Sequence, residues 1–417
     1  MTKQYEKACG IDVHNRFLIG TILNRDSSMI QARFDRTIDG ILSLRNWIVE
    51  NKCPVVGCES TNSFWYPIYD TLSPVCEVIV GNAHDMKVLS HKKTDKIDSE
   101  IIAKLILNDM VLPSYIATPV QRDLRNLMRY RKFLVFQTVD IKNRIHSILQ
   151  AELFHLSSIL TDPFGLSGKL VIQGIISGKS AESIMALIPD KVLKAKGDLI
   201  QELLNQQISA TAIIELDSAM SLLETLNKQI KEITTLARNS VLSLYPREFE
   251  ILCSIPGVGE ITAMTLISEI GDFKNFVSGD KLAAWAGLVP KVHQSANHYV
   301  RCGITHRGSK YLRSSLVEAA HAATRKKGSR FKEYYDTRKD RLGKGKTIVA
   351  VARKILTIAW HLIVNDELFV NEGEKTKKQV NLKSVEIPLT LTLKQVVERF
   401  VRAKEMLVDK DRRGFCL

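Results

Sequence analysis

Hydrophobic and polar positions alternate with a period of two through much of the first eighty residues, a pattern typical of strands with one buried face. The five strands that this pattern predicts are 7–13, 17–24, 28–35, 54–60 and 76–83. Between them, apolar residues recur with helical spacing over 38–51 and near 63–72. Strands that alternate with helices in this way predict an N-terminal α/β domain.

After residue 95 the hydrophobic period becomes helical, and the longest stretches are 119–152 and 217–241. Two long amphipathic helices about sixty residues apart predict an antiparallel coiled-coil hairpin with an inserted subdomain. An ordinary helical-bundle core would give the same periodicity, so both interpretations stay open. The fold class predicted for the whole chain is therefore α/β plus all-α.

A glycine-rich turn between two apolar helical stretches occurs at 254–271, "SIPGVGEITAMTLISEIG". This spacing resembles a helix-hairpin-helix element, in which the turn amides around Gly257 and Gly259 point at a phosphate. The alternative is a plain tight connection in which both glycines supply a positive φ. The sequence does not decide between the two.

The formal net charge of +14 over 417 residues favours a polyanionic partner, most often nucleic acid. Between Arg301 and Lys346 there are fourteen Lys and Arg residues against four Asp and Glu, too one-sided for an ordinary solvated face. We predict a phosphate-binding surface here. Its predicted contact residues are Arg301, Arg307, Lys310, Arg313, Arg325, Lys326 and Lys327.

The seven scattered cysteines form no CxxC pair, which argues against a zinc site or a disulfide framework and for a reducing, cytoplasmic location. The N-terminal residues contain no signal-peptide core. The most apolar late stretch, 348–364, is interrupted by Arg353, Lys354 and His361, so no membrane span is expected.

Four acidic residues lie within or beside apolar segments of the N-terminal region. Asp12 interrupts the first apolar strand and Glu59 ends the strand at 54–60, positions that are costly unless the charge is paired or metal-bound. Asp95 and Asp98 lie at the head of an apolar helix, where end-capping is the simpler explanation. Acids at strand ends and at a helix head are nevertheless how oxygen ligands converge on Mg²⁺.

The order Asp12, Glu59, Asp95, Asp98 resembles the DEDD signature of RuvC-like domains with the RNase H fold. Together with "SIPGVGEITA", "LAAWAGLVPKVHQS" and "GITHRGSKYLR", it makes residues 6 to 362 similar to the insertion-sequence-110 family of DEDD transposases. The resemblance implies a bridge-RNA-guided DNA recombinase that acts as a homo-oligomer, a dimer or tetramer. It also implies that the four acids bind Mg²⁺, with Mn²⁺ as an alternative.

The family's serine nucleophile corresponds to Ser295, which Ala296 follows where family members often have glycine. A serine needs a proton acceptor and charge stabilisation, and His293, His298 and several arginines are close in sequence. Without the resemblance, Ser295 would be interpreted as a loop serine. The alternative hydroxyls are Thr305, Ser309, Ser314 and Ser315.

The resemblance also implies four regions. They are a RuvC-like DEDD domain at 1–115, a coiled-coil linker with an inserted subdomain at 116–245, a helical serine-bearing transposase domain at 246–365 and an extension at 366–417. Two other functions remain open. One is a metal-dependent nuclease of Holliday junctions in which only the acids act, and the other is a non-catalytic nucleic-acid-binding protein.

Overall fold

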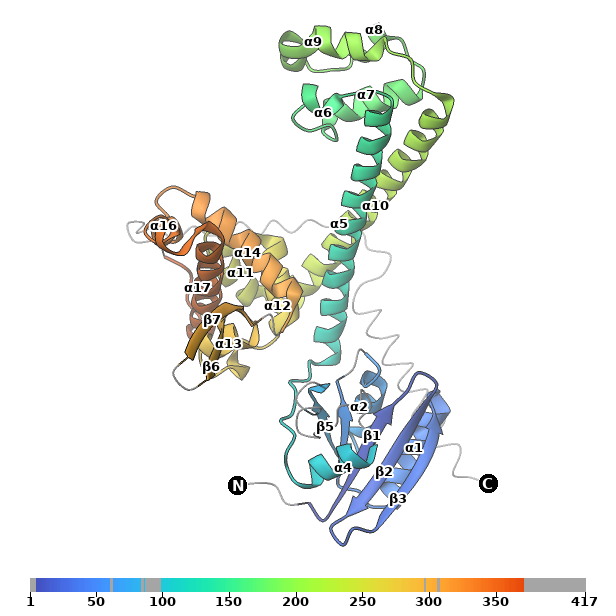
Figure 1. Ribbon diagram of the computed structural model, residues 1–417, viewed down its shortest axis with the longest axis vertical. Coiled ribbons are helices and arrows are strands. Elements are labelled where there is room, and N and C mark those ends of the chain that lie inside the picture. Colours follow the sequence, from blue (N-terminus) through green and yellow to red (C-terminus); the bar gives the residue numbers. More distant parts are fainter. Residues whose placement is uncertain are drawn as a thin grey trace. The chain divides into compact units, whose positions relative to one another are not determined.

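The computed structural model describes residues 5–60, 63–83, 86, 99–295, 298–305 and 308–370. The chain divides into two compact units, Met1–Ala117 and Thr118–Leu417, and each is described by itself (Figure 1).

The N-terminal unit is built on a five-stranded mixed sheet with the strand order β3-β2-β1-β4-β5. Strands β1, β2 and β3 form an antiparallel meander, while β4 and β5 run parallel to β1. The strands are β1 (Lys7–Val13), β2 (Phe17–Asn24), β3 (Met29–Asp35), β4 (Val55–Glu59) and β5 (Glu77–Gly81). All five predicted strands are confirmed within one or two residues, and the topology is consistent with an RNase H-like domain.

Helices cover both faces of this sheet. On one face, α1 (Ile38–Glu50) and α2 (Tyr66–Leu72) bury a core that includes Ile11 and Cys58. On the other, α4 (Ser99–Leu107) packs on residues of the opposite strand parity, such as Ala8 and Val55.

The close approach of α4 depends on glycine. A Cβ at Gly10 would lie 2.0 Å from the carbonyl oxygen of Ser99, and one at Gly57 would lie 2.4 Å from Ile106. These two glycines, neighbours in register on β1 and β4, let the helix backbone lie directly on the sheet. The start of α4 is thereby fixed over the middle of β1.

The second unit contains the predicted antiparallel helical hairpin. Its long helices are α5 (Pro119–Ala151) and α10 (Ala210–Leu244), and α10 begins seven residues before the predicted start. Arg131 on α5 contacts Thr234, and Arg144, further along α5, contacts Glu215, earlier on α10, so the two helices run antiparallel. The inserted helices α6 (Leu156–Ile159), α7 (Leu166–Ile176), α8 (Ala181–Met185) and α9 (Asp190–Leu204) form a separate hydrophobic core with the hairpin's far end.

The rest of this unit is mostly helical around one large core. Its elements are α11 (Pro246–Ser254), α12 (Glu260–Ile270), the 3₁₀ turn η1 (Phe273–Asn275), α13 (Gly279–Trp285), α14 (Lys310–Arg325), α15 (Arg330–Asp336), α16 (Lys339–Leu342) and α17 (Lys344–Asn365). Leu124 and Met128 of α5 belong to the same core, so α5 is structurally part of it.

One element of this region differs from the prediction. Strands β6 (Pro290–Ser295) and β7 (His298–Ile304) form a two-stranded antiparallel hairpin, where a purely helical domain is expected from the sequence. The stretch alternates Val292 with polar residues, which is strand-like. The other residues of the stretch are mostly polar and mark no buried face, so the sequence alone favours a loop.

The turn between α11 and α12 corrects one expectation. Gly257 does have a positive φ of 87°, and a Cβ there would lie 2.3 Å from the carbonyl oxygen of Ala319 on α14. Gly259 has an ordinary φ of −91° and is the N-cap of α12, so it needs no left-handed conformation. Arg238 bonds Glu260 in the first turn of α12, so this helix N-terminus already has a carboxylate beside it.

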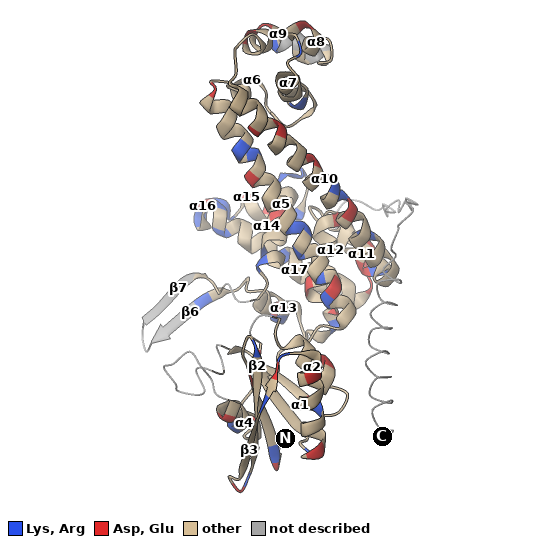
Figure 2. Cartoon of the chain, turned by 90° about the vertical axis from the view of Figure 1, so that its right-hand side faces the viewer, with Lys and Arg blue, Asp and Glu red and all other residues tan. Residues whose placement is uncertain are grey.

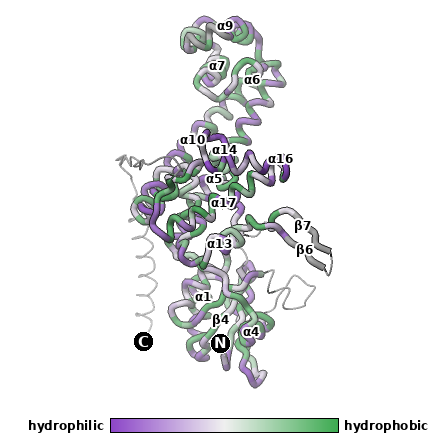
Figure 3. The backbone as a smooth tube through the Cα atoms, turned by 90° about the vertical axis from the view of Figure 1, so that its left-hand side faces the viewer, coloured by the Kyte–Doolittle hydropathy of each residue, from purple (hydrophilic) through white to green (hydrophobic). Residues whose placement is uncertain are grey.

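Helix α17 is the one described helix long and apolar enough, by length and composition alone, to cross a membrane. Its apolar face, including Val351, Ile355 and Leu356, is buried in the core of the second unit. Figure 3 shows the neighbouring α16 as hydrophilic. The helix has the burial expected of a core helix.

Candidate functional site

Asp12 and Glu59 lie at the same edge and on the same face of the N-terminal sheet. The parallel strands β1 and β4 are aligned so that Ile11 faces Cys58, and each acid is the next residue along its strand. Because successive side chains alternate between faces, both acids fall on the face opposite Ile11 and Cys58, which is the face that α4 covers. This arrangement is consistent with the expectation that the acids converge at strand ends.

Helix α4 is anchored close to these acids. The Ser99 hydroxyl lies 2.7 Å from the Thr21 hydroxyl, and Thr21 faces Gly10 across the β1–β2 pair. Gly10 is two residues before Asp12, on the same face of β1. The first described turn of α4 therefore lies over Gly10, two residues before Asp12 on β1.

Asp95 and Asp98 lie outside the described residues, so the structure does not place them. Asp98 directly precedes Ser99 in the chain. Among the side chains that the structure describes, no cluster of three His, Cys, Asp or Glu residues forms a metal site. The described residues thus include two of the four expected ligands, Asp12 and Glu59. Two carboxylates brought together at the ends of adjacent parallel strands are the feature of this part that suits a divalent cation.

His14 is a neighbour of the acids that the sequence analysis missed. Its Nε2 atom lies 3.0 Å from Oδ2 of Asp12, and the imidazole packs on the Phe17 ring at 4.4 Å. Both side chains are partly exposed, at 30% for His14 and 24% for Asp12. His14 lies one residue past the end of β1, where strand periodicity does not predict the direction of its side chain. His14 is placed to orient the Asp12 carboxylate.

Ser295 is the last residue of β6 and pairs in register with His298, the first residue of β7. Arg301, another predicted contact, pairs with Val292 on the same hairpin. Arg307 lies outside the described residues. Chain topology thus brings Ser295 and His298 to the end of the hairpin.

The hairpin leads into α14 through a tightly fixed turn. Gly308 has a φ of 74°, and a Cβ there would lie 2.1 Å from the Trp285 carbonyl oxygen. Nη1 of Arg313 donates to the carbonyl oxygens of Ala286 at 3.3 Å and Gly308 at 3.1 Å, and partial burial lowers the pKa of its guanidinium. Arg313 therefore braces the turn, in addition to its predicted phosphate contact.

The other predicted phosphate contacts are exposed. Lys310 opens α14, with its Nζ 5.4 Å from the Tyr311 ring centre. Arg325, Lys326 and Lys327, at the end of α14 and just after it, are exposed, and none of the ion pairs between described residues involves them. Figure 2 shows further Lys and Arg residues on α16. This surface is available to a polyanion.

Comparison with known proteins agrees with the order of these features. A sequence model of DEDD-type IS110 transposases matches residues 9–153, which include Asp12, Glu59, Asp95 and Asp98. A second model, described as the transposase IS116/IS110/IS902 family, matches residues 249–336, which include the β6–β7 hairpin and α14. The two matched segments together span more than half of the chain.

Individual relatives carry similar descriptions. The transposase for insertion sequence element IS1111A of Coxiella burnetii is 24% identical over 324 residues, 76% of this chain and 79% of that protein. The transposase for IS1328 of Yersinia enterocolitica is 31% identical over 145 residues, 34% of this chain and 43% of that protein. The pilin gene-inverting protein of Moraxella bovis is 35% identical over 122 residues, 28% of this chain and 38% of that protein.

The chain spans less than half the length of the last two relatives, whereas the similarity to the Coxiella burnetii transposase includes most of both proteins. The N-terminal match implies a divalent metal, and the C-terminal match places the hairpin and α14 in the second part of a transposase. The chain belongs to the IS110 family of insertion-sequence transposases, DNA-processing enzymes of the DEDD type.

Proposed function

We propose that this transposase cuts and rejoins DNA through a covalent phosphoserine intermediate formed on Ser295, assisted by a Mg²⁺ site at the DEDD residues. The supporting observation is the placement of Asp12 and Glu59 at the ends of adjacent parallel strands, on one face of the sheet. Two carboxylates so placed would repel each other unless a cation lay between them.

Asp12, Glu59, Asp95 and Asp98 would hold the metal, and Mn²⁺ would be accepted by the same oxygen ligands. When bound, the cation supplies charge stabilisation for the phosphate under attack. His14 would fix the orientation of the Asp12 carboxylate, because its Nε2 is 3.0 Å from Oδ2.

In the chemical step, Ser295 Oγ would form a bond to phosphorus as the bond from phosphorus to one deoxyribose oxygen breaks. The serine proton leaves Oγ, and the departing deoxyribose oxygen gains a proton. His298, the register partner of Ser295, is the candidate to carry that proton. Reversal with a different strand end would reseal the DNA without net hydrolysis.

The partners proposed from the family resemblance are donor and target DNA and a bridge RNA as guide. We further propose a cytoplasmic homo-oligomer, a dimer or tetramer, in which the acids and the serine can come from different protomers. The exposed cations at 325–327 suit such polyanionic partners.

The test is to trap the intermediate. Wild-type protein, donor and target DNA, guide RNA and Mg²⁺ are incubated, quenched with EDTA and denatured, and the protein is analysed by mass spectrometry. A nucleotide on the peptide containing "VHQSANHY" is the expected result. Cleaved DNA with free ends and no adduct would instead support the alternative nuclease, in which only the acids act.

A further prediction concerns the exposed cations after α14. Replacing Arg325, Lys326 and Lys327 together with alanine should weaken binding to every DNA or RNA sequence, because phosphate contacts carry no sequence information. The plot of log affinity against log salt should flatten by about one unit for each phosphate interaction that the substitutions remove. Fluorescence anisotropy at several salt concentrations measures this slope.

The matched control replaces Lys332 and Lys339, which already share Asp336 at 2.6 and 2.8 Å. These two lysines have an internal counter-ion, so their removal should change the slope less. Equal effects of both sets would show that net charge alone matters, and an unchanged slope in the triple variant would contradict a binding role.

A further inference from the structure

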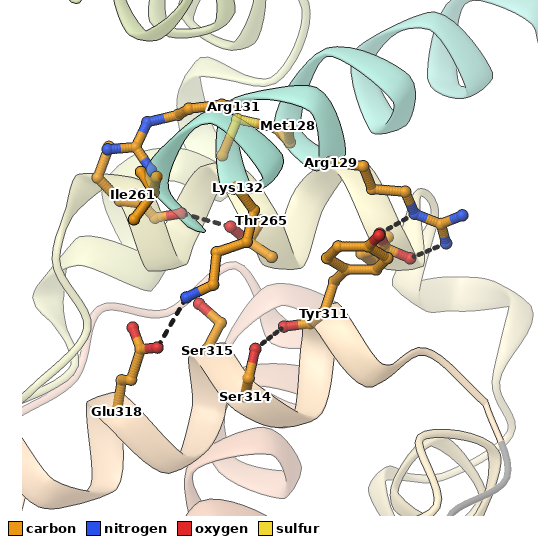
Figure 4. A pocket seen from close by; sticks show the side chains of 12 residues that line it. Met128, Arg129, Arg131, Lys132, Ile261, Thr265, Tyr311, Ser314, Ser315 and Glu318 are labelled. Carbon is orange, nitrogen blue, oxygen red and sulfur yellow. Dashed lines mark hydrogen bonds and ion pairs between the residues drawn. The ribbon is translucent and has the colours of Figure 1, made fainter. Parts of the chain in front are cut away.

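A cleft of about 290 Å³ lies between α5, α12 and α14, within the second unit (Figure 4). The charged and aromatic groups that matter in its lining are Arg129, Arg131, Lys132, Glu269, Tyr311 and Glu318. Figure 4 shows Arg129 beside the Tyr311 ring at one end and Lys132 pointing to Glu318 at the other. The two ends differ in how their charges are balanced.

At the first end the charges are compensated. Glu269 is only 2% exposed, and Arg129 grips it with two hydrogen bonds, Nε to Oε1 at 2.7 Å and Nη2 to Oε2 at 2.8 Å. The Arg129 guanidinium also lies 5.0 Å from the centre of the Tyr311 ring. A bidentate, buried pair of this kind holds α5 against α12.

At the second end Glu318 pairs with Lys132, and its charge also favours the charged form of Arg131. Lys132 Nζ lies 2.9 Å from Oε1 of Glu318, whose side chain is 64% exposed. Arg131 is half-buried, which lowers the pKa of its guanidinium, and its Nε donates to the Thr234 hydroxyl at 2.7 Å. Within the described part of the chain no carboxylate lies at ion-pair distance from Arg131.

A half-buried arginine that keeps its charge at neutral pH and has a neutral hydroxyl as its hydrogen-bond acceptor favours an external anion. The planar guanidinium can donate two parallel N–H hydrogen bonds to the oxygens of a phosphate.

An exposed aromatic ring adjoins this end of the cleft. Phe136 follows Lys132 by one helical turn and is 55% exposed, and Lys132 Nζ lies 5.4 Å from the centre of its ring. Phe133, the neighbouring exposed ring on α5, is 50% exposed. Aromatic rings beside cations are the recurrent means of binding single strands, because unpaired bases stack on the rings while phosphates meet the cations.

We propose that this cleft holds a backbone phosphate of single-stranded nucleic acid, with Arg131 and Lys132 as the cations and Phe136 as a stacking surface for an adjoining base. The inference rests on the proposed function only in that the enzyme handles nucleic acid. It assigns no role to Ser295 or to the acids, and a double strand, whose bases are stacked internally, would not use Phe136.

The first experiment compares Arg131→Gln with wild-type full-length protein. Binding to a 20-nucleotide single-stranded DNA, and to an RNA of the same sequence, is measured by fluorescence anisotropy over a range of salt concentrations. The expected result is a salt slope lowered by about 0.7 units, the value for one phosphate contact on a single strand. The strand type that shows the larger loss identifies the source of the phosphate.

Two control variants separate this role from others. Arg144→Gln removes a cation on the same helix that is 62% exposed and paired with Glu215, and it should leave the slope unchanged. Thr234→Val removes the hydrogen bond to Arg131 but leaves the cation, so its slope should stay near the wild-type value. An equal drop in Thr234→Val would show that helix packing causes the effect and would overturn the proposal.

The stacking surface is tested by Phe136→Leu, which keeps an apolar side chain on α5. Single-strand affinity should fall about fivefold or more, the effect of losing one stacked base, while duplex affinity changes little. Unchanged single-strand binding in both Arg131→Gln and Phe136→Leu would overturn the proposal. Formation of the covalent adduct by wild-type protein is scored separately, so failure of the cleft and failure of the serine mechanism are distinguishable.

Discussion

Ser295→Ala is expected to bind DNA, RNA and metal with affinities near those of the wild-type protein and to form no covalent adduct. Alanine provides no oxygen to attack phosphorus, whereas the serine hydroxyl contributes little to binding. Strand exchange should fall by on the order of 10⁴-fold or more, as for the loss of other enzyme nucleophiles. The measurements are gel shift for binding and denaturing electrophoresis for the protein–DNA adduct.

The matched control is Ser314→Ala. Ser314 lies on α14, and its hydroxyl donates to the Tyr311 carbonyl oxygen at 3.1 Å, a bond within the helix whose removal costs little. This variant should still form the adduct. An adduct that survives in Ser295→Ala and maps to Ser309, Ser314 or Ser315 would keep the reaction class but assign the nucleophile to another residue.

Asp12→Asn should abolish recombination while the N-terminal unit stays folded. Asparagine has the size of aspartate and can still bond His14, but it lacks the charge that a divalent cation requires. Metal affinity should fall by at least about 100-fold, because removing even a residue that only orients a metal ligand costs roughly 10- to 100-fold. Isothermal titration with Mn²⁺ measures affinity, and a recombination assay measures activity.

Asp35→Asn is the control for this change. Asp35 ends β3 on the same sheet and is exposed, so it should affect neither Mn²⁺ binding nor recombination. Glu59→Gln should behave as Asp12→Asn does, because the two acids are adjacent across β1 and β4. Recombination near the wild-type level in Asp12→Asn would exclude a metal site built on this residue.

The N-terminal fold was predictable because its strands carry apolar residues that mark buried faces. Strands β1 and β2 each bury one face against α1 and the other against α4, and their sequences identify them within a residue or two. The hairpin β6–β7 was not predictable by this route. Its strands are mostly polar, and no continuous apolar face distinguishes them from a loop.

Part of the candidate site could likewise be predicted from the sequence, and part could not. Chain order and strand ends were enough to predict Asp12 and Glu59 as neighbours, since carboxyl ends of adjacent parallel strands meet at one edge. The pairing of His14 with Asp12 depends on a rotamer, which a sequence does not specify. The environment of Arg131 depends on Thr234 and Glu318, which are distant in the sequence and meet it only through helix packing.

The hydrogen bonds of Arg125 and Arg129 with α12 can form only after the ribosome has synthesised α12. Arg125 donates to the carbonyl oxygens of Ser268 and Glu269, and Arg129 holds the Glu269 carboxylate, so these bonds span about 140 residues of chain. Helix α5 emerges long before its acceptors exist, and its arginines must stay hydrated until α12 follows. A polypeptide that began at residue 246 would bury Glu269 without these cations, so the helical core of the second unit is expected to be unstable without the start of α5.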